Sequence, residues 1–244
     1  MIKTIGEYVI LMFQSFRKPE KWRVFFKQLF NEFVSLGVDS LGIVTIISLF
    51  TGGIIAIQTA SNIDSPLIPL TMVGFTTRQT MVLEFAPTII SLILAGKVGS
   101  RIASEIGTMQ VTEQIDALRI MGVNPASHLL LPKISASMLI NPVLIVYSIA
   151  LGLIGGWASC IGTGVVSSHD YVAGIQFWFD PFSIVYALIK AVVFAFILTS
   201  ISGFQGYRTT GGAIDVGRSS TKGVVFSSIM IIIFDLILTQ MLLI

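Results

Sequence analysis

Charged residues are scarce in this chain. Asp, Glu, Lys and Arg together make up 11% of its 244 residues, whereas a soluble globular domain has about 25%. Hydrophobic residues make up 54%, so too few polar side chains remain to cover a surface that faces water. This composition argues against an ordinary soluble domain and favours a membrane protein.

Cysteine and histidine are scarcer still. The single cysteine, Cys160, excludes an intrachain disulfide framework and a cysteine-rich metal site. The two histidines, His128 and His169, lie far apart and in different loops, so we expect no metal site. The net charge of +2 is small, and no aromatic residues alternate with a basic stripe, which argues against a nucleic-acid partner.

Catalytic and nucleotide-binding motifs are also absent. Residues 212–219 resemble a phosphate-binding loop in outline, but Arg218 stands where such a loop needs lysine, and the segment directly follows an expected membrane span. We therefore expect that the chain is not an enzyme, holds no cofactor and binds no ATP itself.

Long hydrophobic stretches are abundant. A helix needs about 20 apolar residues to cross a bilayer, and four stretches reach that length: Leu41–Ala60, Ile134–Val166, Phe182–Phe204 and Val224–Ile244. A fifth stretch, Leu70–Gly96, is less apolar because it contains Arg78, Glu84 and Pro87.

The basic residues indicate that the fifth stretch also crosses. If it does, thirteen Lys and Arg lie on one side, and the opposite loops, 61–69 and 167–181, contain none. This distribution agrees with the positive-inside rule. We therefore predict five spans, a cytoplasmic N-terminus and a C-terminus outside. The thirteen residues are Lys3, Arg17, Lys18, Lys21, Arg23, Lys27, Lys97, Arg101, Arg119, Lys133, Arg208, Arg218 and Lys222.

An amphipathic segment precedes the first span. Its apolar residues recur at spacings of three and four, with basic residues on the opposite face. We expect residues 1–36 to form an interfacial helix region and residues 37–244 the five-span domain; a soluble helix docked on a partner fits the same pattern. The apolar residues are Trp22, Phe25, Phe26, Leu29, Phe30 and Phe33.

Small residues recur at every fourth position in two of the expected spans and in the segment that follows the stretch Leu70–Gly96. Such ridges let helix backbones approach closely in lipid, so they predict helix contacts. They are Ala95, Gly99, Ala103 and Gly107; Gly152, Gly156 and Cys160; and Gly52, Ala56 and Ala60.

A short amphipathic helix is expected between the second and third spans. Val111, Ile115 and Leu118 share one face of it, and Gly122 with the following Asn-Pro pair ends it. On the cytoplasmic side, such a helix could contact a soluble subunit and transmit its movement, or it could be a simple interfacial loop helix.

The same region resembles a known family. The run AGKVGSRIASEIGTMQVTEQIDALRIMGVNP (95–125) is similar to the signature of the MlaE/YrbE family of ABC transporter permeases, and GGAIDVGRSSTKGVV (211–225) resembles that family's second cytoplasmic loop. The resemblance covers essentially the whole chain.

The resemblance implies an all-α permease in the bacterial inner membrane, with a periplasmic C-terminus, that forms a homodimer. Its partners would be a cytoplasmic ABC ATPase, which binds the ATP, and a periplasmic ring of MCE-domain proteins. The complex would move phospholipid and maintain the lipid asymmetry of the outer membrane. Residues 107–123 would then be the coupling helix, with Glu113, Asp116 and Arg119 contacting the ATPase.

Besides Arg78, which lies nearer the outer surface, the expected spans contain three ionisable residues: Glu84, Lys190 and Asp235. A charge at this depth costs at least about 2.5–3.5 kcal/mol, so such residues are usually paired or face water. Lys190 and Asp235 come at similar depths, so they could form a structural ion pair, or Lys190 could attract a phosphate headgroup in a lipid cavity. Glu84 and Pro87 indicate a kinked helix at a dimer axis or cavity wall.

Two further features concern the residues expected in the outer half of the membrane. Related permeases often carry arginine directly before this glutamate, where this chain has Leu83, and Arg78 could only partly replace it. The segment with Tyr171, Phe177, Trp178 and Phe179 is typical of an interfacial aromatic belt. By the family resemblance, it could instead be a short helix that supports the MCE ring.

Two other function classes fit a five-span protein. An ion-coupled secondary transporter could use Glu84, Lys190 and Asp235 as relays, but it would predict inverted internal repeats, and none is visible between the halves of the chain. A non-transporting membrane scaffold would have no ATPase partner.

Overall fold

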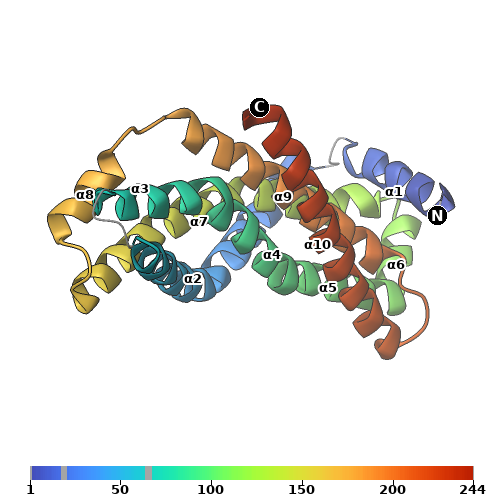
Figure 1. The fold of residues 1–244 in the computed structure, drawn as a ribbon. Helices are drawn as coiled ribbons and strands as arrows, with labels where there is room; N and C mark the ends of the chain where they lie inside the picture. Colours follow the sequence, from blue (N-terminus) through green and yellow to red (C-terminus); the bar gives the residue numbers. More distant parts are fainter. Residues whose placement is uncertain (1, 18–20, 64–67, 244) are drawn as a thin grey trace. The chain divides into compact units, whose positions relative to one another are not determined.

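The structure is a computed structural model, and it describes residues 2–17, 21–63 and 68–243. Lys18 and Ile244, which enter the predictions above, lie outside the described residues. The described chain is helical throughout and contains no β-strand (Figure 1). Its shorter helices are α1 (Ile2–Ser15), α6 (Gln114–Ile120) and α8 (Ser168–Gln176).

Among the described residues, five helices are long and apolar enough to cross a membrane, which agrees with the predicted number of spans. Four of them are α2 (Trp22–Ser61), α7 (Pro125–Thr163), α9 (Phe182–Tyr207) and α10 (Ala213–Leu243). The fifth runs from Thr71 to Val111 and consists of α3 (Thr71–Thr80), the π-helix η1 (Met81–Ile89), α4 (Ile90–Leu94), the π-helix η2 (Ala95–Gly99) and α5 (Ser100–Val111).

The amphipathic aromatic segment and the first span belong to one continuous helix. The aromatic segment forms the first turns of α2, where Trp22, Phe26 and Phe30 are exposed, and the helix continues without a break to Ser61. The expected boundary between residues 36 and 37 therefore falls inside a helix. No proline separates the aromatic segment from the span that follows, so nothing in the local sequence stops the helix there.

The second span departs from regular α-helix around Pro87. Pro87 lies inside η1, and proline has no N–H to donate to the carbonyl four residues earlier. A π-helix adds one residue to the turn and is often found at functional sites. The expected irregularity at this proline thus takes the form of a π-helical segment.

The described fold divides into two compact units. Unit 1 comprises Met1–Asp39, Ser91–Asn141 and Val192–Ile244, and unit 2 comprises Ser40–Ile90 and Pro142–Ala191. Each is described by itself below.

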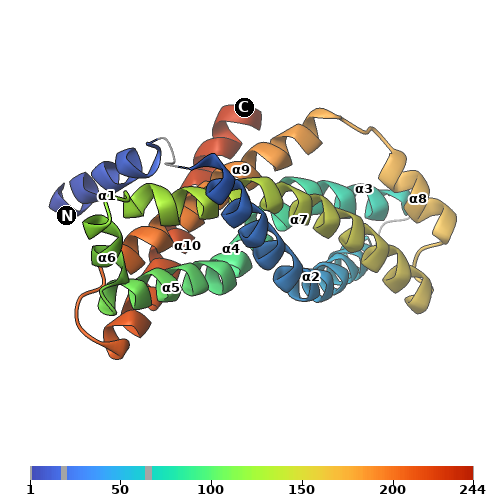
Figure 2. The same ribbon diagram turned by 180° about the vertical axis from the view of Figure 1, so that it is seen from behind.

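Unit 2 is built on close glycine contacts. In Figures 1 and 2, α3 and α8 lie side by side, and a Cβ added at Gly74 would meet the Tyr171 carbonyl oxygen. Likewise, a Cβ at Gly52 on α2 would meet the backbone of Gly152 on α7. The small-residue ridges in these helices therefore mark helix contacts, as predicted.

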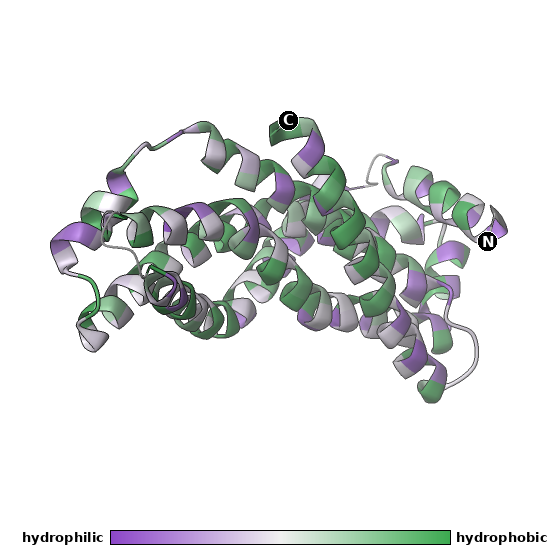
Figure 3. Cartoon of the chain, in the orientation of Figure 1, coloured by the Kyte–Doolittle hydropathy of each residue, from purple (hydrophilic) through white to green (hydrophobic). Residues whose placement is uncertain are grey.

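Unit 1 uses the other predicted ridge. A Cβ added at Gly206 would meet the backbone of Ala103, and one at Gly107 would meet the Thr209 side chain. Glycine thus lets α5 approach the end of α9, and α10 packs along α5. In Figure 3, hydrophobic residues follow most of α9 and α10, whereas hydrophilic residues are frequent in α6 and in the first turns of α10.

Candidate functional site

A charged pair lies at the centre of unit 2. Lys190 of α9 is fully buried, and its Nζ donates a hydrogen bond to Oε1 of Glu84 in η1 at 3.0 Å. The Glu84 side chain stays 44% exposed in the single chain. A pair of this kind offsets part of the cost of placing charge within a span. It also leaves one member, the carboxylate, accessible from outside the chain.

Pro87 is connected to this pair through Leu83. In an α-helix, the Leu83 carbonyl would accept a hydrogen bond from the N–H of residue 87, which proline lacks. Lys190 Nζ donates to this carbonyl at 3.3 Å. Lys190 therefore donates both to the Glu84 carboxylate and to the Leu83 carbonyl, which lacks its usual α-helical backbone donor because residue 87 is proline.

Tyr186 completes the cluster, and the sequence interpretation missed it. Lys190 Nζ lies 4.5 Å from the centroid of the Tyr186 ring, within the range of a cation–π contact. The Tyr186 hydroxyl also donates to Glu84 Oε1 at 3.4 Å. Its position four residues before Lys190 places it on the same helix face, which was the available signal.

Arg78 connects α3 to the end of α8 through backbone carbonyls. Its guanidinium is buried and donates to the carbonyls of Ile175, Phe177 and Trp178 at 2.6, 3.0 and 3.2 Å. These carbonyls lie at the C-terminal end of α8, where backbone acceptors lack helical partners. Arg78 thus connects α8 to α3, and its expected partial replacement of an arginine at position 83 stays a prediction.

The aromatic residues in and after α8 form the expected interfacial belt only in part. Phe177, Trp178 and Phe179 are exposed, as a belt requires, but Tyr171 is fully buried and donates its hydroxyl hydrogen to the Leu153 carbonyl. The prediction for Tyr171 is therefore wrong. Its place within α8, opposite the glycines of α7, turns the ring inward.

Asp235 lies on α10 and is half-buried. It belongs to unit 1, whereas Lys190 belongs to unit 2. The expected pairing of these two residues stays a prediction.

The expected coupling segment, 107–123, consists of two pieces. It includes the end of α5 and all of α6, and between them Glu113 adopts a left-handed backbone conformation with φ of 60°. Such a conformation is uncommon for a residue other than glycine. The break at this point was not visible in the sequence, because no glycine, proline or asparagine marks it.

The polar residues of α6 make contacts within unit 1. Arg119 donates to Asp116 at 3.0 Å and to the hydroxyl of Tyr207, the last residue of α9, at 2.7 Å. Glu113 is exposed, and so are the apolar side chains of Ile120 and Met121, at 88% and 68%. Arg119 therefore joins α6 to α9, while an apolar pair faces outward.

A second buried lysine lies in unit 1. Lys133 of α7 is 3% exposed and donates to Glu32 of α2 at 2.5 Å and to Glu105 of α5 at 2.8 Å. The triad connects three of the long helices through one cation. The sequence interpretation missed it, because these residues are far apart in the chain.

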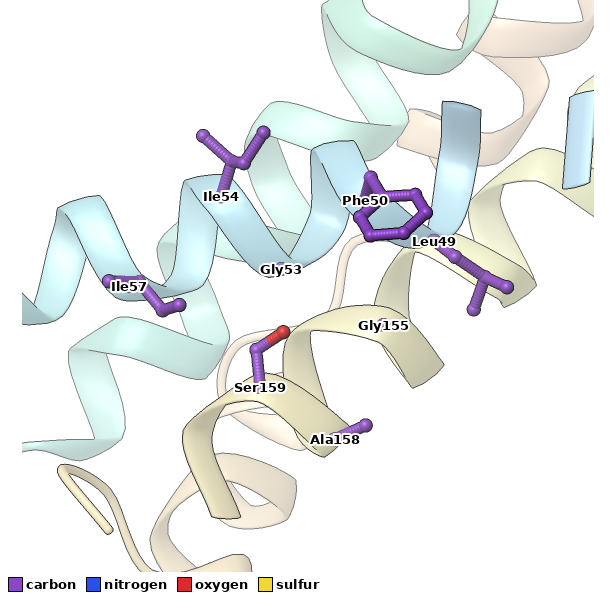
Figure 4. A pocket seen from close by; sticks show the side chains of 8 residues that line it. All are labelled: Leu49, Phe50, Gly53, Ile54, Ile57, Gly155, Ala158 and Ser159. Carbon is purple, nitrogen blue, oxygen red and sulfur yellow. The ribbon is translucent and has the colours of Figure 1, made fainter. Parts of the chain in front are cut away.

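Among the described residues, no group of three or more His, Cys, Asp or Glu side chains could hold a metal ion. Unit 2 has an apolar groove of about 310 Å³ between α2 and α7, lined mostly by apolar and small residues (Figure 4). These are Leu49, Phe50, Gly53, Ile54, Ile57, Gly155, Ala158 and Ser159.

Comparison with known proteins places the chain in a family. The family model described as Permease MlaE matches residues 29–241. A probable ABC transporter permease protein of Rickettsia bellii is 30% identical over 99% of this chain and 93% of its own length. The intermembrane phospholipid transport system permease protein MlaE of Haemophilus influenzae is 29% identical over 97% and 91%. Protein TRIGALACTOSYLDIACYLGLYCEROL 1, chloroplastic, of Arabidopsis thaliana is 33% identical over 90% and 63%. The chain is a multi-pass membrane protein that belongs to the MlaE permease family.

Proposed function

We propose that this chain is the membrane-spanning permease subunit of an ABC transporter in the bacterial inner membrane. It would exchange phospholipid with a periplasmic ring of MCE-domain proteins and so help to maintain outer-membrane lipid asymmetry. ATP would be bound and hydrolysed by a separate cytoplasmic subunit, and two copies of the chain would form the channel. The name of the Haemophilus relative, an intermembrane phospholipid transport system permease protein, supports phospholipid as the substrate class.

The observation that carries this proposal is the Lys190–Glu84 pair. A fully buried ammonium and a partly exposed carboxylate sit inside a span, next to the π-helix that contains Pro87. A phosphate group that reaches this position can compete with Glu84 for Lys190, because both are oxygen anions and both accept charge-assisted hydrogen bonds. The apolar residues of the surrounding helices would hold the acyl chains.

Energy would enter through α6. Its exposed Ile120 and Met121 offer an apolar contact for an ATPase, and the exposed Glu113 adds a polar one. Arg119 joins α6 to Tyr207, the last residue of the continuous helix α9, which also carries Lys190. A displacement of α6 could therefore be passed along α9 to the charged pair. In this proposal Arg119 and Asp116 transmit the movement.

The decisive experiment is ATP-dependent lipid transfer by the chain reconstituted with its co-purifying ATPase. We expect Lys190→Ala to reduce transfer strongly and to leave membrane insertion unchanged, whereas Lys222→Ala, an exposed lysine on α10, should leave both unchanged. Transfer that is unaffected by Lys190→Ala would leave the pair only a structural role.

Two outcomes would favour the other function classes. Purification without any ATPase would favour a scaffold. Substrate movement that follows an ion gradient and needs no ATP would favour a secondary transporter.

The orientation of α6 has its own test. Cys160 is buried and is the single cysteine of the chain, so a cysteine introduced at the exposed Gln114 provides a selective label. We expect a membrane-impermeant thiol reagent to reach Gln114→Cys from the cytoplasm. Labelling from the periplasm would contradict the proposed site of ATPase contact.

A further inference from the structure

Unit 1 contains an apolar pocket that the proposed transport route does not use. It has a volume of about 500 Å³ and lies between α1 and α9, within the size range of small-molecule sites. Its lining is Tyr8, Val9, Met12, Phe13, Phe16, Arg17 and Phe196. The pocket therefore combines an apolar wall with a single cation.

Helix α1 is fixed in place, so the pocket has a defined shape. The Tyr8 hydroxyl is hydrogen-bonded to Ser200 of α9 at 2.8 Å, and the rings of Phe16 and Phe196 stack with centroids 6.3 Å apart. Just beyond the C-terminal end of α1, the Ser127 hydroxyl donates to the carbonyl of Arg17 at 2.9 Å. The main chain of Arg17 is thereby held at the edge of the pocket.

The charges around the pocket favour an anion. Within the described part of the chain, the Arg17 guanidinium takes part in no ion pair, and it is exposed. The nearby carboxylate of Glu7 is paired with Arg208 at 3.2 Å. Burial raises the pKa of the Tyr8 hydroxyl, which therefore stays neutral and does not repel an anion.

The outer face of α1 is suited to lipid. Ile5, Val9, Ile10 and Phe13 are each more than half exposed. In a protein that spans the membrane, an exposed apolar helix face of this kind meets acyl chains. An acyl chain that follows this face enters the pocket beside Phe13 and brings its headgroup toward Arg17.

From this geometry we infer that the α1–α9 pocket is a binding site for an anionic phospholipid of the surrounding bilayer, with the acyl chain against Phe13, Phe16 and Phe196 and the phosphate on Arg17. Basic pockets beside membrane helices bind anionic headgroups in this way. The bound lipid would stay with the protein and hold α1 on α9. It is separate from the lipid that the Lys190–Glu84 pair is proposed to handle.

The test is native mass spectrometry of the purified full chain in detergent, titrated with phosphatidylglycerol or with phosphatidylcholine of the same acyl chains. We expect phosphatidylglycerol to bind more tightly. Arg17→Ala should weaken its binding about fivefold, the effect of losing one interfacial cation. Arg17→Lys should retain most of the binding, because it retains the charge.

Two further variants make the test specific. Arg23→Ala removes an exposed cation outside the pocket, and we expect no change in binding. Val9→Trp fills the pocket and leaves Arg17 intact, so it should weaken binding of both lipids. Equal binding of the two lipids, or equal losses for Arg17→Ala and Arg23→Ala, would overturn the inference. None of these measurements depends on transport activity.

Discussion

The contact between α2 and α7 allows a quantitative prediction. A methyl group added at Gly52 would overlap the Gly152 carbonyl, so the two helices would have to separate by roughly 1 Å or more to reach normal contact. Overpacking of this kind costs about 1–3 kcal/mol. We therefore expect Gly52→Ala to lower the free energy of unfolding, although alanine favours the helical state by about 1 kcal/mol over glycine.

Gly42 provides the matched control. It lies on the same helix, but an added Cβ there has no atom within 4 Å, so Gly42→Ala gains the helix propensity alone. The difference in the free energy of unfolding between the two variants therefore gives the cost of the steric overlap at Gly52. At about 2–4 °C per kcal/mol for a chain of this size, Gly52→Ala should unfold about 2–12 °C below Gly42→Ala.

The difference in unfolding temperature is measured by heating each variant in detergent and determining the folded fraction by size-exclusion chromatography. If Gly52→Ala unfolds at the same temperature as Gly42→Ala, or above it, the close approach of α2 and α7 is not as described. Binding of ATPase or lipid is not needed for this experiment.

Two further predictions use the same assay. Arg78→Lys keeps the charge but loses the planar fork that serves three carbonyls, so we expect a loss of about 1.5–3 kcal/mol and a lower unfolding temperature; an unchanged temperature would contradict the anchoring role. Lys133→Met leaves Glu32 and Glu105 without their shared cation and should lower the unfolding temperature, and adding Glu32→Gln should restore part of the loss by removing one of the two like charges. No restoration in the double variant would show that the carboxylates do not repel one another.

Hydrophobic runs and basic residues predicted the number of spans, because both signals depend on the average composition of long segments and not on single residues. They did not predict where helices end. The helix that contains the first span begins at Trp22, before the apolar stretch that starts at Leu41, since an amphipathic segment and an apolar one can form one helix. The second continues to Val111, where a threonine and a left-handed glutamate end it without a sequence signal.

The candidate site was only partly predictable for a related reason. Glu84 and Lys190 stood out because charge within a span is costly, but their pairing depends on the packing of η1 against α9, which no local pattern encodes. Tyr186 and the Lys133 triad were missed because tyrosine is common in spans and because three separate helices supply the triad. Arg119 was expected to contact the ATPase, and its contact with Tyr207 became visible only in the fold.

The contact between Arg119 and Tyr207 makes it possible to distinguish two roles of Arg119. As a direct ATPase contact, Arg119 would act independently of Tyr207; as a link within the chain, it would act through it.

Tyr207→Phe removes the hydroxyl that Arg119 reaches at 2.7 Å but keeps the ring, whose centroid lies 5.7 Å from the guanidinium. We expect Tyr207→Phe and Arg119→Ala each to reduce lipid transfer per ATP hydrolysed, and the double variant to be no worse than Arg119→Ala, because residues that share one interaction are not additive. If the effects of the two substitutions multiply, or if Tyr207→Phe changes nothing while Arg119→Ala releases the ATPase, Arg119 is a contact residue, and the movement of α6 reaches α9 by another route.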